Sequence, residues 1–339
     1  MRSAEAVALP RTLTLPAIRG RAVARIGGRL LGFMALSLIL LDEIGCPVNA
    51  YVDGIGRIYF AGSSHAIARV NGISGEGLVR IGEEGSGERQ FKAPWGIAAD
   101  AAGRIYVVDS ENHRIVRISD MAGSGWTVLG RQGSGVREFS SPAGLALDAR
   151  GRIYVADSEN HRIVRMDDIT GAGWTTFHPQ GILAGLPQYR PGMEVRIRPA
   201  AITVDGAERI YFTDRQHSRI VRISDMTGAG LIVLGQPGSG AGQFMDPLGI
   251  AVDRAGRIYV ADTENHRIVR VTDMTGRGWV AFGSQGKSIG QFDTPTAVAI
   301  DLVGRIYVVD FMNDRIVRME NMNGDGWTVL DTYTGESSS

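Results

Sequence analysis

The chain has 339 residues, of which 46 are glycine and 44% are apolar, and 36 basic side chains balance 36 acidic ones. The balanced charge excludes the basic field by which proteins attract nucleic acid, so nucleic acid is not an expected partner. The single cysteine, Cys46, excludes an internal disulfide and any metal cluster built on cysteines.

Residues 1–44 form a leader that differs from the rest of the chain. It carries six arginines against three acidic residues and ends in an apolar run of 12 residues, Leu30 to Leu41. A transmembrane helix needs about 20 apolar residues, so we expect no membrane span. A basic lead before a short apolar run resembles a secretory signal and favours export from the cytoplasm, but Asp42 and Glu43 stand where a cleavage site needs small residues. A disordered or misassigned leader is the alternative.

Six copies of a unit of about 48 residues follow, and a repeat of this length indicates a solenoid or a propeller. In each copy a proline precedes an aspartate by six residues, as Pro94 precedes Asp100. The intervals between the repeated tyrosines are 47, 48, 57, 48 and 48 residues, so one copy is nine residues longer. The expected units are 45–82, 83–130, 131–178, 179–235, 236–283 and 284–331, followed by a disordered tail at 332–339.

The second unit predicts four strands, which we name A to D. They cover residues 96–100, 104–109, 114–119 and 126–130, separated by turns rich in glycine, aspartate and asparagine. A single antiparallel sheet of this kind exposes two edges and buries little, so six of them are stable when they pack face to face around an axis. The prediction is an all-β, six-bladed β-propeller in which each blade is complete in sequence. Closure of the ring by a strand from before Asp42 is the alternative.

The repeated phrase after strand B carries a family resemblance. Asp-Ser-Glu-Asn-His-Arg-Ile-Val-Arg runs from Asp109 and again from Asp157, with a threonine variant from Asp262. This phrase resembles the NHL repeat, and the resemblance covers Pro47 to about Leu330. It implies a six-bladed propeller. It implies no single function, because NHL propellers include protein, RNA and small-molecule binders as well as relatives of an amidating lyase.

Copied polar residues are interpreted as structural. His113, His161 and His266 could hold a zinc ion if they converged, but they belong to the repeated phrase, so equivalent copies lie on different blades. We therefore assign no metal and no cofactor. The aspartates that end strand B, such as Asp109, are interpreted as turn-makers that accept backbone N–H bonds and face the arginine five residues on.

Residues that depart from the repeat are the candidates for function. Strand order places the B–C and D–A connections on one face of the propeller. Departures expected there are Trp95, Arg215, Gln216, Phe311 and Met312. The long D–A connection between 178 and 198 adds Tyr189, Arg190, Met193, Arg196 and Arg198. Aromatic, apolar and guanidinium groups of this kind are typical of binding hot spots.

The favoured function is a non-catalytic scaffold, expected as a monomer, that binds an unknown protein or small ligand on this face. One alternative is a lyase-type enzyme with a metal or a water in the axial channel. It is disfavoured because the residues beside the strand A prolines, such as Val48 and Thr296, form no polar cluster. A second alternative is a structural repeat protein without a specific ligand.

Overall fold

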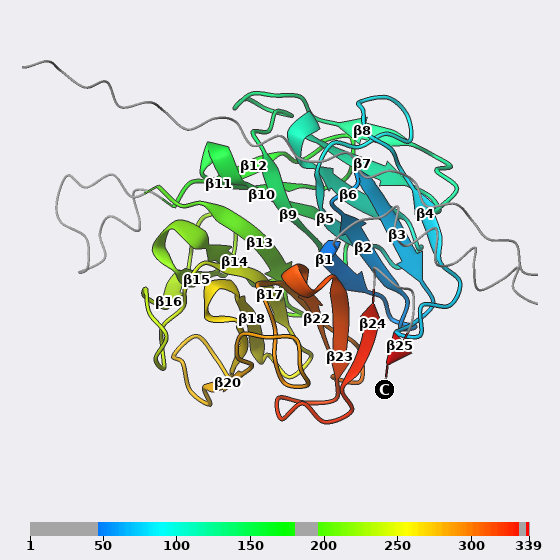
Figure 1. Ribbon diagram of the computed structural model, residues 1–339. Coiled ribbons are helices and arrows are strands. Elements are labelled where there is room, and N and C mark those ends of the chain that lie inside the picture. The colour runs from blue at the N-terminus through cyan, green and yellow to red at the C-terminus, as the bar shows by residue number, and fades with distance from the viewer. Residues whose placement is uncertain (1–46, 180–195, 332–336, 339) are drawn as a thin grey trace, which may run out of the picture.

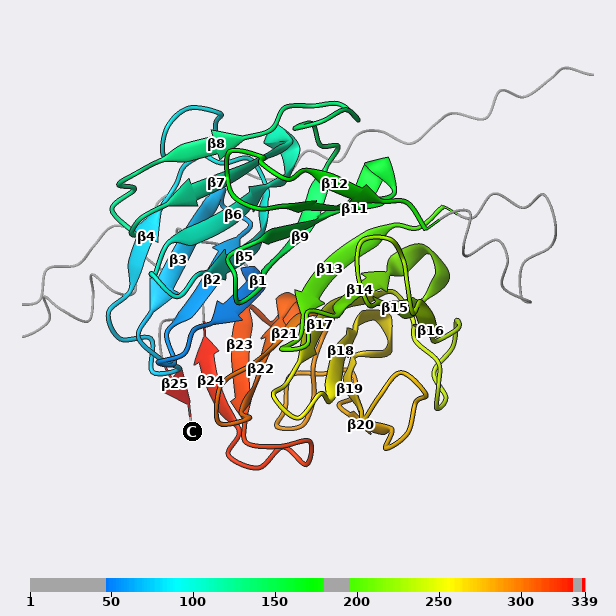
Figure 2. The ribbon, with the colours of Figure 1, turned by 180° about the vertical axis from the view of Figure 1, so that it is seen from behind.

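Each of the six copies folds into an antiparallel sheet whose strands follow one another in chain order (Figure 1). The computed structural model describes residues 47–179, 196–331 and 337–338, so the predicted leader lies outside it. The six sheets are arranged around a common centre, and the predicted six-bladed propeller is confirmed (Figure 2). No helix in the described part of the chain is long and apolar enough to cross a membrane.

The strands occupy equivalent places in every blade. Strand A, nearest the axis, is β1 (Pro47–Val52), β5 (Pro94–Ala99), β9 (Pro142–Leu147), β13 (Pro199–Val204), β17 (Pro247–Val252) and β21 (Pro295–Ile300). Strand B is β2 (Ile58–Gly62), β6 (Ile105–Asp109), β10 (Ile153–Asp157), β14 (Ile210–Asp214), β18 (Ile258–Asp262) and β22 (Ile306–Asp310). Strand C is β3 (Ala66–Val70), β7 (Arg114–Ile118), β11 (Arg162–Met166), β15 (Arg219–Ile223), β19 (Arg267–Val271) and β23 (Arg315–Met319). Strand D is β4 (Val79–Ile81), β8 (Thr127–Leu129), β12 (Thr175–Phe177), β16 (Ile232–Leu234), β20 (Val280–Phe282) and β24 (Thr328–Asp331).

Single turns of 3-10 helix form the B–C connections of blades two to six. They are η1 (Ser110–Asn112), η2 (Ser158–Asn160), η3 (Arg215–His217), η4 (Thr263–Asn265) and η5 (Phe311–Asn313). We call the face that carries these turns and the D–A connections the upper face. The lower face carries the A–B and C–D turns.

The A–B turns are closed by the aspartate that follows strand A. In blade two a carboxylate oxygen of Asp100 accepts hydrogen bonds from the backbone N–H groups of Ala102 and Arg104, at 3.0 and 2.9 Å. Gly103 has a φ of 79°, which a residue with a side chain adopts only with strain. The hydroxyl of Tyr106 donates to the same carboxylate at 3.3 Å. The repeated aspartate and tyrosine are therefore one turn motif.

The apolar core lies between the blades. One cluster joins Tyr106 and Val108 of blade two to Leu145 and Val155 of blade three, and each neighbouring pair of blades has such a cluster. The cluster that contains Phe60 and Tyr307 closes the ring between blades one and six. A single sheet would leave its apolar faces in water, so the blades are stable because each one covers its neighbours.

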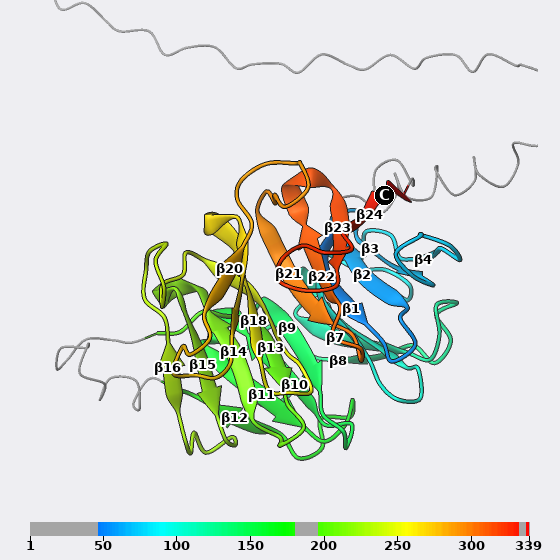
Figure 3. The same cartoon turned by 90° about the horizontal axis from the view of Figure 1, so that it is seen from below.

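The ring closes without an exchanged strand in the described part of the chain, as the completeness of each unit predicts. β1 to β4 form blade one and β21 to β24 form blade six. Near the C-terminus, Ser337–Ser338 form the short strand β25, which pairs with β24 (Figure 3). The outer edge of β24 offers unpaired N–H and C=O groups, which an extended segment can satisfy.

Candidate functional site

Two aromatic departures from the repeat pack against the same apolar cluster, between blades one and two. Trp95 is the second residue of strand A in blade two, and Phe311 begins η5 of blade six. Both pack as half-buried side chains against the cluster that contains Val48. Met312 follows Phe311, and 61% of its surface is exposed. We call Trp95, Phe311 and Met312 the apolar group. Met312 is exposed as the sequence predicts, whereas neighbouring blades partly cover Phe311.

A second set of departures lies on blade four. Arg215 forms a two-pronged ion pair with Asp246 of the next blade, at 2.7 and 2.5 Å, and Gln216 beside it is exposed. Arg198 is exposed and donates to Glu159 of the preceding blade at 2.7 Å. We call Arg198, Arg215 and Gln216 the polar group. Its two arginines are thus bound to carboxylates of neighbouring blades.

The structure separates the two groups. Blade four is three places around the ring from blade one, so the apolar and polar groups lie on opposite sides of the axis. Arg196 is exposed and close to the polar group in sequence. Tyr189, Arg190 and Met193 lie outside the described residues.

The repeated histidines bind backbone groups of the next blade. Nδ1 of His113 accepts a hydrogen bond from the N–H of Ser141 at 3.0 Å, and Nδ1 of His266 accepts one from Thr294 at 3.1 Å. Both donors precede the proline of the next strand A and have a positive φ, 42° and 54°. The imidazoles therefore hold a strained connection in place.

His161 precedes the longer D–A connection and contacts a carbonyl oxygen there, not an N–H group. Its Nδ1 lies 2.7 Å from the carbonyl oxygen of Ile197, which demands a proton on that nitrogen. Within the described ranges no three His, Cys, Asp or Glu side chains gather closely enough to hold a metal ion. His113, His161 and His266 stand in three blades and contact three different connections.

The aspartates that end strand B bind the connections above them. In blade two, Asp109 accepts hydrogen bonds from the N–H of Lys92 at 2.6 Å, the amide of Asn112 at 2.8 Å and Nε of Arg114 at 2.6 Å. Burial raises the pKa of Asp109, while these donors lower it. The prediction that such aspartates accept backbone N–H bonds and face the arginine five residues on is confirmed.

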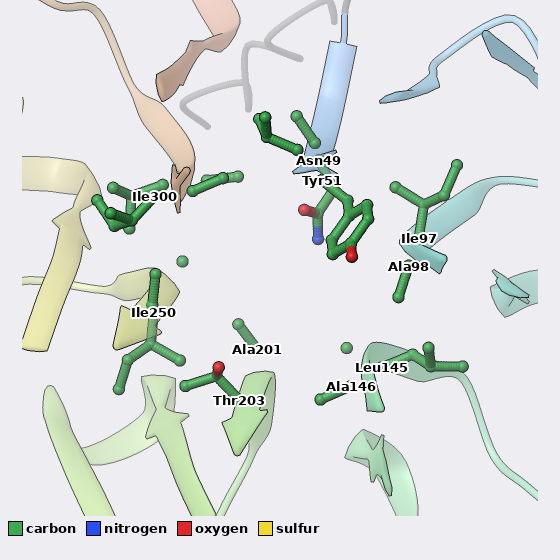
Figure 4. Close-up of a pocket in the computed structure, with 18 of the residues that line it drawn as sticks. Asn49, Tyr51, Ile97, Ala98, Leu145, Ala146, Ala201, Thr203, Ile250 and Ile300 are labelled. Carbon is green, nitrogen blue, oxygen red and sulfur yellow. The ribbon is translucent and has the colours of Figure 1, made fainter. Parts of the chain in front are cut away.

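An axial cavity of about 410 Å³ lies among the six inner strands (Figure 4). Its lining begins at the third residue of strand A and reaches the A–B turns at Gly54 and Leu302, so the cavity occupies the half of the channel nearest the lower face. The residues beside the strand A prolines, such as Val48 and Trp95, do not line it. The position beside the proline, where channel residues are expected from the sequence, therefore lies outside the cavity.

Three polar side chains line this cavity, and two of them come from blade one. Asn49 and Tyr51 project from β1 toward the middle of the space, and Thr203 lies across from them on β13 (Figure 4). The other five blades carry glycine or alanine at the position of Asn49. At the position of Tyr51, four carry alanine and blade four carries Thr203. Comparison of the copies at these two positions could have found the site.

The surroundings of Tyr51 keep its hydroxyl neutral. Burial raises the pKa of Tyr51, and the carboxylates of Asp53 and Asp100 raise it further. The ring lies 6.2 Å from that of Tyr59 and packs against the apolar clusters between blades one, two and three. The phenol is thus held by its ring, with its hydroxyl at the channel.

Comparisons with known proteins identify the repeat. The model of the NHL repeat matches residues 91–118, 139–166 and 244–270, and no curated protein matches the chain. A catalytically inactive virginiamycin B lyase from Staphylococcus aureus, with quinupristin, is 16% identical over 82% of both chains, with a TM-score of 0.56.

Two further solved structures show the same architecture. A chain of the nidogen/laminin complex is 19% identical over 81% of this chain and 89% of its own, with a TM-score of 0.56. An auxiliary nutrient binding protein from Bacteroides thetaiotaomicron is 16% identical over 81% and 69%, with a TM-score of 0.59. Similarity at this level shows the fold alone.

Proposed function

We propose that this NHL-repeat propeller is a non-catalytic binding scaffold that holds a partner protein on its upper face. The observation that carries the proposal is the apolar group. Trp95, Phe311 and Met312 break the repeat and come from two blades that flank blade one. In blades two, three and five the positions of Phe311 and Met312 carry Ser-Glu or Thr-Glu, and in blade four they carry Arg-Gln.

The energetic argument favours a contact surface. Tryptophan and phenylalanine add large contact areas, and a half-buried aromatic ring is already ordered, so a partner orders few further bonds when it covers the ring. Met312 adds an adaptable apolar side chain with 61% of its surface in water. Burial of such a group in an interface removes this apolar area from water.

The polar group supplies a second contact region across the axis. Arg198 and Arg215 already pair with Glu159 and Asp246, so each presents a partly neutralised ion pair to a partner. An exposed pair such as Arg198–Glu159 contributes about 0–1 kcal/mol to stability, so it is not needed to hold the fold. We expect the polar group to select the partner and the apolar group to supply the binding free energy.

The test replaces each residue of the apolar group with a residue found at the equivalent position of another blade. The triple variant Trp95→Ala, Phe311→Ser and Met312→Glu introduces side chains that equivalent positions already carry, so we expect it to fold. Wild type and variant are used to capture proteins from an extract of the source cells, and bound proteins are quantified by mass spectrometry. We expect one partner to bind wild type stoichiometrically and to be lost by at least about tenfold from the variant.

A variant of the lower face is the matched control. Ile55→Ser removes an equally apolar side chain that is 76% exposed, and it should retain the partner. Capture of the same proteins in the same amounts by wild type and the triple variant would contradict the proposal. So would loss of the partner from the Ile55→Ser control alone.

A further inference from the structure

We propose that the axial cavity is a second binding site, for a neutral small molecule that combines an apolar part with a hydrogen-bonding group. The site is separate from the upper face and does not depend on the proposed partner. Its volume of about 410 Å³ lies within the range of roughly 300–1,000 Å³ that small-molecule pockets occupy. All six inner strands contribute to the wall, so the cavity is part of the rigid centre of the ring.

The lining defines the class of ligand. Aliphatic residues such as Leu145, Ile250 and Ile300 line the cavity together with polar atoms, and no charged side chain among the described residues lines it. A charged ligand would lose its hydration here without gaining a partner, whereas a neutral apolar ligand gains from leaving water. The lining therefore favours an uncharged ligand that has both an apolar part and hydrogen-bonding groups.

Three polar groups give the cavity its specificity. The Asn49 amide, the Tyr51 hydroxyl and the Thr203 hydroxyl line the space, and none has a hydrogen-bond partner within the described part of the chain. An amide donates and accepts, and so does each hydroxyl. A carbonyl or hydroxyl on the ligand can satisfy them, and few well-placed polar groups in an apolar pocket are what orient a bound molecule.

The fold itself does not require these polar groups. At the register of Asn49, a Cβ on Gly96 would come within 2.6 Å of the carbonyl oxygen of Ala143, so blade two has room for glycine alone. Blade one carries a whole amide at that register, and a tyrosine two residues later. Asn49 and Tyr51, which depart from the repeat near the axis, are thus side chains that point into the cavity.

Apolar side chains also lie on one side of the cavity's lower end, where Leu302 lines it. Ile55, Leu302 and Val303 occupy the A–B turns of blades one and six, and their exposed fractions are 76%, 49% and 77%. The two turns are adjacent, since a Cβ on Gly54 would lie 3.3 Å from Cδ1 of Leu302. Other blades carry alanine, glycine, arginine or glutamate in these turns. Exposed apolar side chains beside the cavity offer the apolar part of such a ligand a first contact as it leaves water.

The probe for the test is Prodan, a neutral naphthalene ketone whose emission shifts to shorter wavelength in apolar surroundings. We expect one Prodan per chain to bind wild type saturably, with a blue shift. Thr203→Tyr places in blade four the residue that blade one carries at the same register, so it fills the cavity without a new backbone geometry. It should weaken Prodan binding by at least about tenfold, and Ala299→Tyr, at this register in blade six, is a second blocking variant.

The polar groups are tested separately. The double variant Asn49→Ala and Tyr51→Phe keeps the ring and removes both hydrogen-bonding groups of blade one. It should weaken Prodan binding by about three- to tenfold, the effect of one neutral hydrogen bond. Naphthalene, measured by competition with Prodan, has no hydrogen-bonding group. It should therefore bind wild type and the double variant equally.

Residues beside the cavity's lower end and on the upper face provide the controls. Ile55→Ser should slow Prodan association, whereas Ile289→Ser, a substitution of an equally exposed isoleucine on the upper face, should not. The upper-face triple variant should bind Prodan as wild type does, so failure of one proposal leaves the other standing. Absence of saturable binding, or equal binding by folded Thr203→Tyr and Ala299→Tyr variants, would overturn the assignment.

Discussion

The Nε–H of Arg114 donates to Oδ2 of Asp109 at 2.6 Å, and both side chains are buried at the top of blade two. The same guanidinium donates to the carbonyl oxygens of Ser86 and Gln90, in the connection that enters the blade. One buried pair thus joins strands B and C to the D–A connection. Equivalent clamps in blades three, five and six hold the connections that form the upper face.

Removal of one clamp should destabilise the protein strongly. Arg162→Met leaves Asp157 buried without its guanidinium, and we expect the free energy of unfolding to fall by about 3–5 kcal/mol. Urea denaturation followed by tryptophan fluorescence measures the change. The matched control is Arg131→Met, since that arginine is 79% exposed and pairs with Glu138. Its effect should stay below about 1 kcal/mol, and equal losses in both variants would refute the account.

Close packing of the inner strands predicts a second effect. Gly96→Ala places a methyl group 2.6 Å from the carbonyl oxygen of Ala143, so the strands must move apart. We expect a loss of about 1–3 kcal/mol in the free energy of unfolding. Gly206→Ala is the control, because nothing lies within 4 Å of the added group. A change of similar size at both positions would show that the inner strands are not packed this closely.

The buried tyrosines predict a loss of stability in alkali. Burial raises the pKa of Tyr154 and of Tyr211 to about 12. The folded form then retains phenolic protons that the unfolded chain releases near pH 10, so the free energy of unfolding falls as the pH rises from about 10 to 12. The Tyr154→Phe and Tyr211→Phe double variant should lose less stability over this window. Thermal unfolding at stepped pH measures it, and identical slopes would argue against the raised values.

The structural interpretation of the histidines predicts that His113→Ala acts on stability and not on metal content. The N–H of Ser141 loses its acceptor, and an alanine with a φ of 54° is strained, so we expect a loss of about 1–2 kcal/mol. Elemental analysis of wild type and variant by mass spectrometry should give the same zinc content. Stoichiometric zinc in wild type that disappears on substitution would support the metal interpretation instead.

The fold could be predicted from the sequence because its signal is copied six times. The strands predicted for blade two agree with β5 to β8 within two residues at every boundary. Strand D begins after Trp126 because that ring packs on Phe91, with centroids 5.3 Å apart, and does not extend the ladder. The predicted start at residue 126 therefore differs from the observed one by a single residue.

The site could be predicted only in part, since its contacts join different blades. Phe311 is expected in water from its loop position, but blade one covers part of its ring. Arg215 is expected to be available, but Asp246 of the next blade binds it. Asn49 and Tyr51 were within reach of sequence reasoning, because they depart from glycine and alanine in the other copies. They were missed because the strand position that faces the cavity depends on the packing of six strands.

The measurement that tests the upper-face proposal most directly is oxidation of Met312 in the captured complex. Its side chain is 61% exposed in the free chain, and the side chain of Met322 is buried, so mild peroxide should oxidise the first quickly and the second slowly. The account predicts that the bound partner slows oxidation of Met312 by at least about tenfold and leaves the rate at Met322 unchanged. Oxidation of Met312 at the same rate in the complex and in the free protein would contradict it.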